Sequence, residues 1–264
     1  MVSTQFLAAL ALAILPALTT AAAIPEPQIH TDTDNGADIV GGSAAVAGQF
    51  PYQVALLRGS SLFCGGVLIN ANTVLTAAHC SVDYPASAVT VRAGSLTYAS
   101  GGTLVKVSKI IVHPSYNSRT VNNDVAIWQL ASPLTAGGNI GYATLPAQGS
   151  DPAAGVSTTV SGWGLTSESG TTLPSSLRYV SVPVVSRATC RSQYGTSAIT
   201  DNMFCAAASG KDSCSGDSGG PITITSTGVL AGTVSWGNGC AQAAYAGVYT
   251  RIGNYVSWIN ANKA

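Results

Sequence analysis

Short apolar or alternating runs, rich in β-branched residues, recur along most of the chain and are separated by Gly, Pro, Asn and Ser. Runs of this length and composition predict β-strands. The expected strands are 52–57, 67–69, 89–93, 104–112, 124–130, 157–164, 178–185, 221–225, 229–236 and 247–252. Many short strands at regular spacing predict an all-β fold with two barrel-like halves. The break between the halves is expected in the Pro-, Gly- and Ala-rich stretch 132–155.

Two segments carry helical signals. Ser186 is suited to cap a short helix that runs through Arg191. Near the C-terminus, apolar residues from Ile252 to Ile259 recur at i, i+3, i+4 and i+7, which is the spacing of one helical face. We therefore expect one short helix in the second half and an amphipathic helix at the end of the chain.

The first 38 residues are expected to be removed. The apolar stretch 6–18 is too short to span a bilayer and is followed by small residues at 19–23, which predicts a secretory signal peptide over residues 1–23. Residues 24–38 are polar and turn-rich, with four acids and no base, which predicts a propeptide. The remaining residues, 39–264, are expected to form a secreted, extracellular, soluble protein without a membrane partner.

Charge and cysteine content limit the partners, disulfides and metal sites that this protein can have. All 11 Lys and Arg lie at or after Arg58, and 4 of the 11 acids lie in residues 24–38, so residues 39–264 carry a net charge of +4. The bases are scattered, which disfavours nucleic acid as a partner. Six cysteines in a secreted chain indicate three disulfides, for which spacing alone leaves fifteen pairings. No cysteine–histidine spacing suits zinc, so neither a metal site nor a cofactor is expected.

One segment offers a nucleophile. Residues 210–221, Gly-Lys-Asp-Ser-Cys-Ser-Gly-Asp-Ser-Gly-Gly-Pro, contain a serine hydroxyl, Ser218, with glycines on both sides. A serine needs a base within hydrogen-bond reach to attack at neutral pH. Residues 39–264 hold two histidines: His79, in Leu-Thr-Ala-Ala-His-Cys, and His113, whose Pro-turn context suits a structural surface residue. Asp124, in Asn-Asn-Asp-Val-Ala, supplies a carboxylate before an apolar strand.

These segments, in the order His, Asp, Ser, resemble the chymotrypsin/trypsin family of serine proteases. The resemblance covers residues 39–264 and implies two six-stranded antiparallel β-barrels, a C-terminal α-helix and an active site between the barrels. It implies that Ser218 is the nucleophile, that His79 is the general base and later the acid, and that Asp124 orients the imidazole. The N–H groups of Gly216 and Ser218 would form the oxyanion hole. The implied disulfides are Cys64–Cys80, Cys190–Cys205 and Cys214–Cys240.

The resemblance also implies how substrate is selected and how the enzyme is activated. Asp212 would lie at the base of the substrate pocket and select Arg or Lys side chains. The rest of that substrate-binding set is Ser213 on the floor, Gly237 and Gly247 at the walls, and Ser235, Trp236 and Gly237 for the substrate backbone. Cleavage before Ile39 would free an α-amine that pairs with Asp217. The expected partners are protein and peptide substrates with Arg or Lys and protein protease inhibitors, and a monomer is expected.

The sequence departs from the trypsin pattern at two places, one in the pocket wall and one in a loop. Ala246 stands where a proline is usual before Gly247, which predicts a looser pocket wall. The segment Ser95–Lys106 corresponds to the calcium loop of animal trypsins but has no Asp or Glu, so no calcium is expected there. Together with the high Ala, Ser and Thr content, the missing loop acids indicate a character closest to fungal or bacterial trypsins.

Two alternatives stay open on the sequence. One is a catalytically inactive homologue that acts as a binding protein, which the loss of a triad residue would have favoured. The other is an enzyme of the same fold with a different specificity. Labelling by a fluorophosphonate probe separates the first from a protease, and a panel of Arg, Lys, Phe and Ala amide substrates separates the second.

Overall fold

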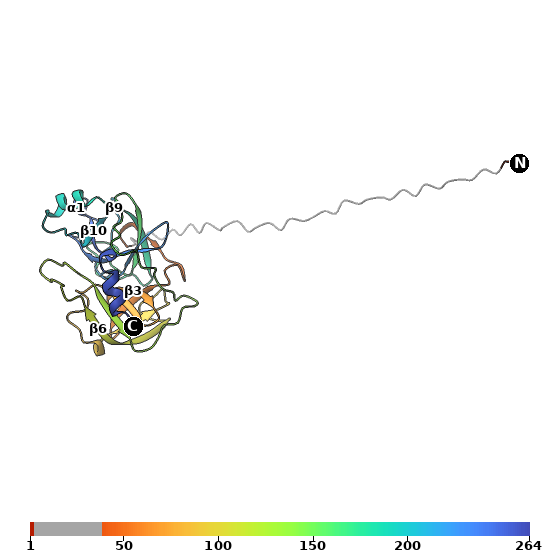
Figure 1. Cartoon of the computed structure of the whole chain (residues 1–264), viewed down its shortest axis with the longest axis horizontal. Coiled ribbons are helices and arrows are strands. Elements are labelled where there is room, and N and C mark those ends of the chain that lie inside the picture. Colours follow the sequence, from red (N-terminus) through yellow and green to blue (C-terminus); the bar gives the residue numbers. More distant parts are fainter. Residues whose placement is uncertain (3–38) are drawn as a thin grey trace. The chain divides into compact units, whose positions relative to one another are not determined.

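The computed structural model describes residues 1–2 and 39–264 of the chain. The expected propeptide and nearly all of the expected signal peptide therefore lie outside the described residues. The polypeptide from residue 39 onward forms two β-barrels, and the chain passes from one to the other between Leu130 and Ser157. In Figure 1, β3 and β6 belong to one half of the molecule, and β9, β10 and α1 belong to the other.

The first barrel is closed by six antiparallel strands in the order β2-β3-β4-β7-β6-β5. Its strands are β2 (Gln53–Arg58), β3 (Ser61–Asn70), β4 (Thr73–Thr76), β5 (Thr90–Ala93), β6 (Thr103–Val112) and β7 (Ala126–Leu130). Apolar side chains fill its interior, among them the fully buried Leu56, Leu68 and Trp128. Trp128 carries a polar N–H into this core, which donates to Ser81 Oγ at 2.9 Å and so is not left unpaired.

The second barrel also has six antiparallel strands, in the order β8-β9-β10-β13-β12-β11, and the β11–β8 pair closes it. Its strands are β8 (Ser157–Gly162), β9 (Arg178–Val185), β10 (Met203–Ala206), β11 (Pro221–Ile224), β12 (Leu230–Trp236) and β13 (Gly247–Arg251). The short β1 (Ser43–Ala44) adds to the edge of β9. β9 shows the period of two that directs its side chains: Val180, Val182 and Val184 are buried, whereas Ser181 and Pro183 are exposed.

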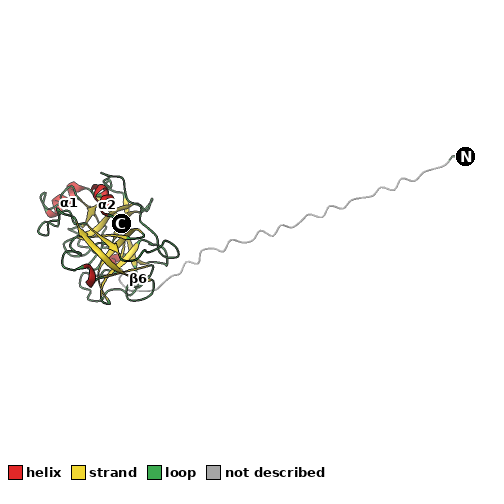
Figure 2. Cartoon of the chain, turned by 60° about the horizontal axis from the view of Figure 1, so that its bottom comes forward, coloured by secondary structure: helices red, strands yellow, loops and turns green. Residues whose placement is uncertain are grey.

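Helices lie outside the barrels (Figure 2). α1 (Arg187–Tyr194) begins where Ser186 Oγ accepts from the Thr189 N–H, as the sequence predicts, and extends beyond Arg191. The C-terminal segment is split into a 3₁₀ turn, η3 (Ile252–Asn254), and α2 (Val256–Asn262). Two further 3₁₀ turns are η1 (Ile39–Gly41) and η2 (Ala86–Ala88). No helix in the described part of the chain is long and apolar enough to cross a membrane.

The C-terminal helix ties the barrels together. Ile252, Tyr255 and Ile259 are buried in one cluster with residues of both barrels, including Val67, Leu75 and Leu230. Asn70 Nδ2, from the first barrel, donates to the backbone oxygen of Ala264 at 2.9 Å. The helix therefore holds the second barrel, in which it begins, against the first barrel. The fold expected from the sequence, two six-stranded antiparallel barrels with a C-terminal helix, is confirmed.

Three disulfides close local loops, and no cysteine is free. Cys64–Cys80 lies in the first barrel, and Cys190–Cys205 and Cys214–Cys240 lie in the second. Their Cα–Cα distances of 6.3, 6.3 and 5.3 Å suit this bond. This is the pairing that the family resemblance implied.

Candidate active site

A buried carboxylate and an imidazole from the first barrel form the first part of the site. His79 follows β4, and Asp124 lies just before β7, which is paired with β4. Asp124 Oδ2 is 2.8 Å from His79 Nδ1, and Oδ1 accepts from the backbone N–H of His79 at 2.9 Å. Asp124 is only 1% exposed, whereas the His79 side chain is 30% exposed. The two bonds fix both the position and the tautomer of the ring, with Nε2 left for chemistry.

The second barrel holds this carboxylate from the other side. Ser235 Oγ, on β12, donates to Asp124 Oδ2 at 2.5 Å, and Thr250 Oγ1, on β13, donates to the Asp124 backbone oxygen at 2.8 Å. The sequence assigned Ser235 to substrate binding through its backbone and missed this side-chain bond. A single hydroxyl in a short buried strand carries no signal that its partner lies 111 residues away along the chain.

An amide cluster supports the loop that carries Asp124. Asn123 adopts a left-handed backbone with φ of 57°, which Asn tolerates better than most residues. Its Oδ1 accepts from Tyr255 Oη at 3.0 Å and from Asn202 Nδ2 at 3.2 Å. Asn202 Nδ2 and Thr200 Oγ1 also donate to Asn122 Oδ1. The second barrel and the C-terminal segment therefore hold a loop of the first barrel in an unusual conformation.

Ser218 lies against this imidazole loop. Its backbone oxygen accepts from the Gly65 N–H at 2.8 Å and lies 3.7 Å from Cys80 Sγ, the residue next to His79. The Gly65 and Cys80 contacts fix the Ser218 backbone beside the disulfide Cys64–Cys80. Within residues 39–264 no hydrogen bond joins Ser218 Oγ to His79, whose Nε2 lies 3.5 Å from Cys80 Sγ. Such catalytic bonds are often long until substrate binds, so the juxtaposition is the informative feature.

Two backbone N–H groups next to the serine are free to bind an anion. In the described chain, neither Gly216 N–H nor Ser218 N–H donates to a protein acceptor. Gly216 has φ of 103°, a conformation that residues with a Cβ rarely adopt. The Asp217 N–H between them donates to the Cys214 oxygen at 3.0 Å and so is not available. The two free donors are those that the sequence predicted for an oxyanion hole.

The serine opens onto a cavity of about 320 Å³ whose base carries a carboxylate. Asp212 is 4% exposed, and its Oδ2 accepts from the Ala241 N–H at 3.0 Å. In the described protein its Oδ1 has no hydrogen-bond partner. Burial raises the pKa of Asp212 to about 6, and the Ala241 N–H together with the neighbouring polar groups of Ser213 opposes the shift. A buried oxygen with no partner is costly, and a cationic group entering the cavity would supply that partner.

The remaining predicted pocket residues line the same cavity. Ser213, Ser235, Trp236, Gly237 and Gly247 all belong to its wall. Ser213 Oγ is 3.2 Å from Tyr249 Oη. Residues 235–237 extend past β11, whose first residue, Pro221, pairs with Thr233, so one edge of this segment has no neighbouring strand. That edge is open to an added strand.

The two wall glycines are small for different reasons. A Cβ on Gly247 would lie 2.7 Å from Asp212 Oδ1 and 3.1 Å from Tyr249 Oη, so the fold itself excludes a side chain. A Cβ on Gly237 would come no closer than 3.6 Å to any protein atom, which is ordinary contact. The protein's own packing therefore does not require a glycine at position 237. The absence of a side chain there leaves room for a ligand.

The wall at Ala246 is held more firmly than the sequence suggests. The Ala246 N–H donates to Gln193 Oε1 at 3.2 Å, and its oxygen accepts from Tyr194 Oη at 2.7 Å. A proline could not make the first bond because it has no N–H. Both partners lie on α1, so the expectation of a looser wall is not supported: the helix braces it.

Asp217, next to the serine, is fully buried. Its Oδ1 accepts from the Gly164 N–H at 2.7 Å and its Oδ2 from the Cys214 N–H at 2.9 Å. Burial raises the pKa of Asp217 to about 7, although the two N–H groups oppose the shift. Ile39 is also fully buried, and the neighbouring Val40 oxygen accepts from the Asp212 N–H at 3.3 Å. The segment that begins at Ile39 thus reaches the base of the pocket.

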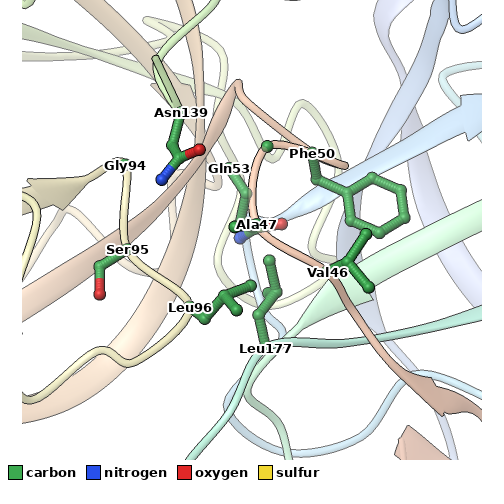
Figure 3. Close-up of a pocket in the computed structure, with 10 residues that line it drawn as sticks. Val46, Ala47, Phe50, Gln53, Gly94, Ser95, Leu96, Asn139 and Leu177 are labelled. Carbon is green, nitrogen blue, oxygen red and sulfur yellow. The ribbon is translucent and has the colours of Figure 1, made fainter.

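Other candidate features belong to the framework. His113 Nδ1 accepts from the Ser115 N–H, and its ring packs on Tyr255 and Trp258. A cavity of about 20 Å³, room for roughly one water molecule, lies between residues 46–53 and the turn Gly94–Leu96; Figure 3 shows the residues that line it. None of the predicted site residues lines it.

The sequence analysis missed one charged residue of the cavity beside Ser218, which is Glu168.

A serine beside an imidazole that a buried carboxylate holds, with two free N–H groups and an acidic pocket close by, fits a serine endopeptidase of the trypsin type. The chain belongs to the trypsin family, whose model matches residues 39–259. It is 52% identical to "Trypsin Blo t 3" of Blomia tropicalis over 84% of each chain. It is 47% identical to "Trypsin alpha" of Drosophila melanogaster, over 84% of this chain and 86% of that protein. These relatives are arthropod proteins and do not support the closer likeness to fungal or bacterial trypsins.

Proposed function

We propose that this protein is a secreted endopeptidase, made as a zymogen, that cleaves peptide bonds after Arg or Lys through an acyl-enzyme. The observation that carries the specificity is the unpartnered Oδ1 of Asp212 at the base of the cavity. A long cationic side chain would neutralise and hydrogen-bond this oxygen, whereas a neutral side chain would leave it buried and unpaired. The names of the relatives, all trypsins, support the same assignment.

The proposed mechanism gives each site residue a role. His79 Nε2 takes the proton of Ser218 Oγ as that oxygen attacks the scissile carbonyl, and the Gly216 and Ser218 N–H groups bind the oxyanion. The imidazolium is stabilised by Asp124 and then gives its proton to the leaving amine as the C–N bond breaks. Water, activated by His79, hydrolyses the acyl-enzyme. Residues 235–237 hold the substrate backbone as an added antiparallel strand.

Specificity is tested by mapping cleavage sites. Denatured protein mixtures are digested with the purified mature enzyme, and the new C-termini are identified by mass spectrometry. We expect Arg and Lys to precede nearly all new ends. A spread of cleavage after aromatic or small residues would overturn the role of Asp212 while leaving the assignment to a serine protease intact.

The triad is tested by a double-mutant cycle. Ser218→Ala and His79→Ala should each lower kcat to a residual rate roughly 10³–10⁴-fold above water. Because the residues act as a unit, the double variant should lose little more than either single variant. Circular dichroism and the melting temperature check that each variant is folded. Near-additive losses would contradict the assignment.

The protein is proposed to be exported as a precursor and then activated. Residues 1–23 would act as the signal peptide and residues 24–38 as the activation peptide, with secretion into an extracellular compartment that suits three disulfides. Cleavage before Ile39 would free an α-amine to pair with Asp217, whose burial makes a cationic partner favourable. We expect a monomer that is inhibited by protein protease inhibitors. The acid-free segment Ser95–Lys106 remains the argument for a fungal- or bacterial-type character.

The activation step requires another protease. Asp38 precedes Ile39, and residues 24–38 contain no Lys or Arg. An acidic side chain would meet Asp212 in the pocket, a like-charge encounter that disfavours self-cleavage. Incubation of the Ser218→Ala precursor with active enzyme should leave the N-terminus unchanged over time. Efficient appearance of Ile-Val-Gly-Gly would contradict this proposal and the Asp212 assignment together.

A further inference from the structure

The substrate cavity carries a second carboxylate, at a different depth from the first. Glu168 lines the cavity together with Asp212 and Ser218. It comes from the connection between β8 and β9, whereas all the other lining residues lie between 212 and 247. Glu168 is exposed, and Asp212 is 4% exposed. One carboxylate therefore lies at the mouth of the cavity and the other at its base.

The position of the Glu168 side chain is defined by its contacts. Its Oε2 accepts from Gln242 Nε2. A Cβ on Gly239 would lie 2.2 Å from Glu168 Oε1, so the carboxylate rests directly on the glycine backbone. Gly239 and Gln242 flank Cys240, which the disulfide to Cys214 ties to the base of the pocket. Glu168 thus lies against the pocket wall.

The charge of Glu168 is not neutralised by the protein. Within residues 39–264 the ion pairs involve Asp124, Asp151 and Asp201, and none involves Glu168. Both carboxylates line one cavity of about 320 Å³, and the Debye length at physiological salt is about 8 Å, so a cation inside the cavity is not fully screened from either of them. A cation inside the cavity therefore interacts with both carboxylates at low and moderate salt.

We propose that Glu168 is a second specificity-determining carboxylate, which favours substrates with a cationic side chain as that side chain enters the pocket. The proposal rests on the proposed function, because it assigns a role to a second residue of the same pocket. The contribution of an exposed carboxylate is modest and screened by salt, unlike that of the buried Asp212. Asp212 sets the preference for cationic over neutral side chains, and Glu168 increases that preference by a smaller amount that depends on salt.

The experiment compares three variants of the mature enzyme. Glu168→Gln removes the charge but keeps the length of the side chain and an oxygen that can accept from Gln242. Glu168→Asp keeps the charge and shortens the reach. Asp83→Asn removes an exposed acid that does not line the cavity, and so controls for net charge. For each, kcat/KM is measured on Arg and Lys substrates and on an ester of citrulline, the neutral isostere of Arg, from low salt to about 0.5 M.

Glu168→Gln is expected to lower kcat/KM on Arg and Lys substrates about two- to fivefold at low salt, the range of exposed ion pairs. The loss should lie mainly in KM, fade at high salt and be absent for the citrulline ester. Glu168→Asp should retain part of the preference, and Asp83→Asn all of it. No change with Glu168→Gln, or equal losses on Arg and citrulline substrates, would overturn the proposal. An Asp212→Ser variant that still prefers Arg would instead overturn the proposed function.

Discussion

Asp124 and Asp212 are both almost completely buried, yet their surroundings differ in kind. Asp124, from the first barrel, accepts three hydrogen bonds, from the His79 backbone, the His79 ring and Ser235. Asp212, from the second barrel, accepts from the Ala241 N–H through Oδ2, and its Oδ1 has no hydrogen-bond partner within residues 39–264. A carboxylate whose partners are supplied by the fold is suited to position those partners, whereas a buried carboxylate oxygen without a partner is suited to bind a ligand.

This difference extends to the regions around the two residues. The Asp124 loop is held from both barrels through Thr250 and the amide cluster of Asn122, Asn123 and Asn202. Around Asp212 the protein instead leaves space: a cavity of about 320 Å³ and a glycine, Gly237, that packing does not require. Changes near Asp124 should therefore affect every substrate equally, and changes near Asp212 should affect cationic substrates alone.

The largest effect is expected from Asp124→Asn. The amide keeps the shape but cannot stabilise the imidazolium, and it favours the wrong tautomer of His79, so kcat should fall by ~10⁴-fold. The loss should be the same for Arg, Lys and citrulline esters, with little change in binding of an arylamidine inhibitor. A loss confined to cationic substrates would show that the two carboxylates are not separate in function.

Asp212→Ser should give the next largest effect, and a selective one. Loss of one partner from a buried charge pair costs about 3–5 kcal/mol, which is roughly 10²–10⁴-fold in kcat/KM on Arg and Lys substrates. The triad is untouched, so a neutral active ester should be hydrolysed at a rate near that of the parent enzyme. Near wild-type kcat/KM on Arg substrates would remove Asp212 from the pocket base.

The pH dependence of cation binding should test the role of Asp212. Burial raises the pKa of Asp212 to about 6, so the group is ionised above pH 6 and neutral below it. Affinity for an arylamidine should be full above this pH and fall about tenfold per unit as the pH drops below it. The measurement is Kd by calorimetry, with Asp212→Asn as the pH-independent control. A constant Kd from pH 7 to pH 4.5 would contradict an ionised Asp212 as the partner of the cation.

Much of the fold and site could be predicted because their signals are local. Period-two patterns located β6 and β9, and the segments around His79, Asp124 and Ser218 contained residues that the fold brings close together. The missed strands β1, β4 and β10 have only two or four residues. β4 is the segment Thr-Val-Leu-Thr, which lies just before His79 in the chain. The start of β3 was missed because Gly65 and Gly66 read as a turn, although a Cβ on Gly66 would lie 2.7 Å from Val74.

The missed site features are all long-range. The Ser235–Asp124 bond joins residues from different barrels, and Glu168 reaches the pocket from a connection 44 residues before Asp212. The Gln193 bond to Ala246 depends on α1 lying against the pocket wall. No periodicity or short motif reports such contacts, because each depends on how the barrels and loops are assembled.

A smaller effect is expected from Tyr255→Phe, which removes one donor from the amide cluster behind Asp124. The lost bond to Asn123 Oδ1 should lower the free energy of unfolding by about 0.5–1.5 kcal/mol. Because Asn202 still donates to the same oxygen, kcat should fall only a few-fold, equally for cationic and neutral substrates. Denaturant unfolding and steady-state kinetics measure the two effects. A selective loss on Arg substrates would mean that the cluster serves the pocket and not the Asp124 loop.

Chelation should produce the smallest effect, because the loop of the first barrel that corresponds to the calcium loop of animal trypsins offers no carboxylate. Ser95–Lys106 has no carboxylate, and hard cations need oxygen ligands, carboxylates above all. The loop's own groups already satisfy one another: Ser95 Oγ donates to the Ser100 oxygen at 2.8 Å, and Arg92 donates to the Gly101 oxygen. The Arg92 guanidinium thus hydrogen-bonds to the Gly101 carbonyl oxygen, which a metal ion could otherwise have bound.

The melting temperature and kcat should therefore be unchanged within error when EDTA replaces calcium. The matched variant is Arg92→Met, which keeps an apolar stem and removes the donor, and which should lower the melting temperature equally with and without calcium. A melting temperature that drops by several degrees in EDTA and recovers with calcium would show an oxygen site in the first barrel. In that case oxygens open to a cation would not be confined to the second barrel, and the contrast between the regions around Asp124 and Asp212 would fail.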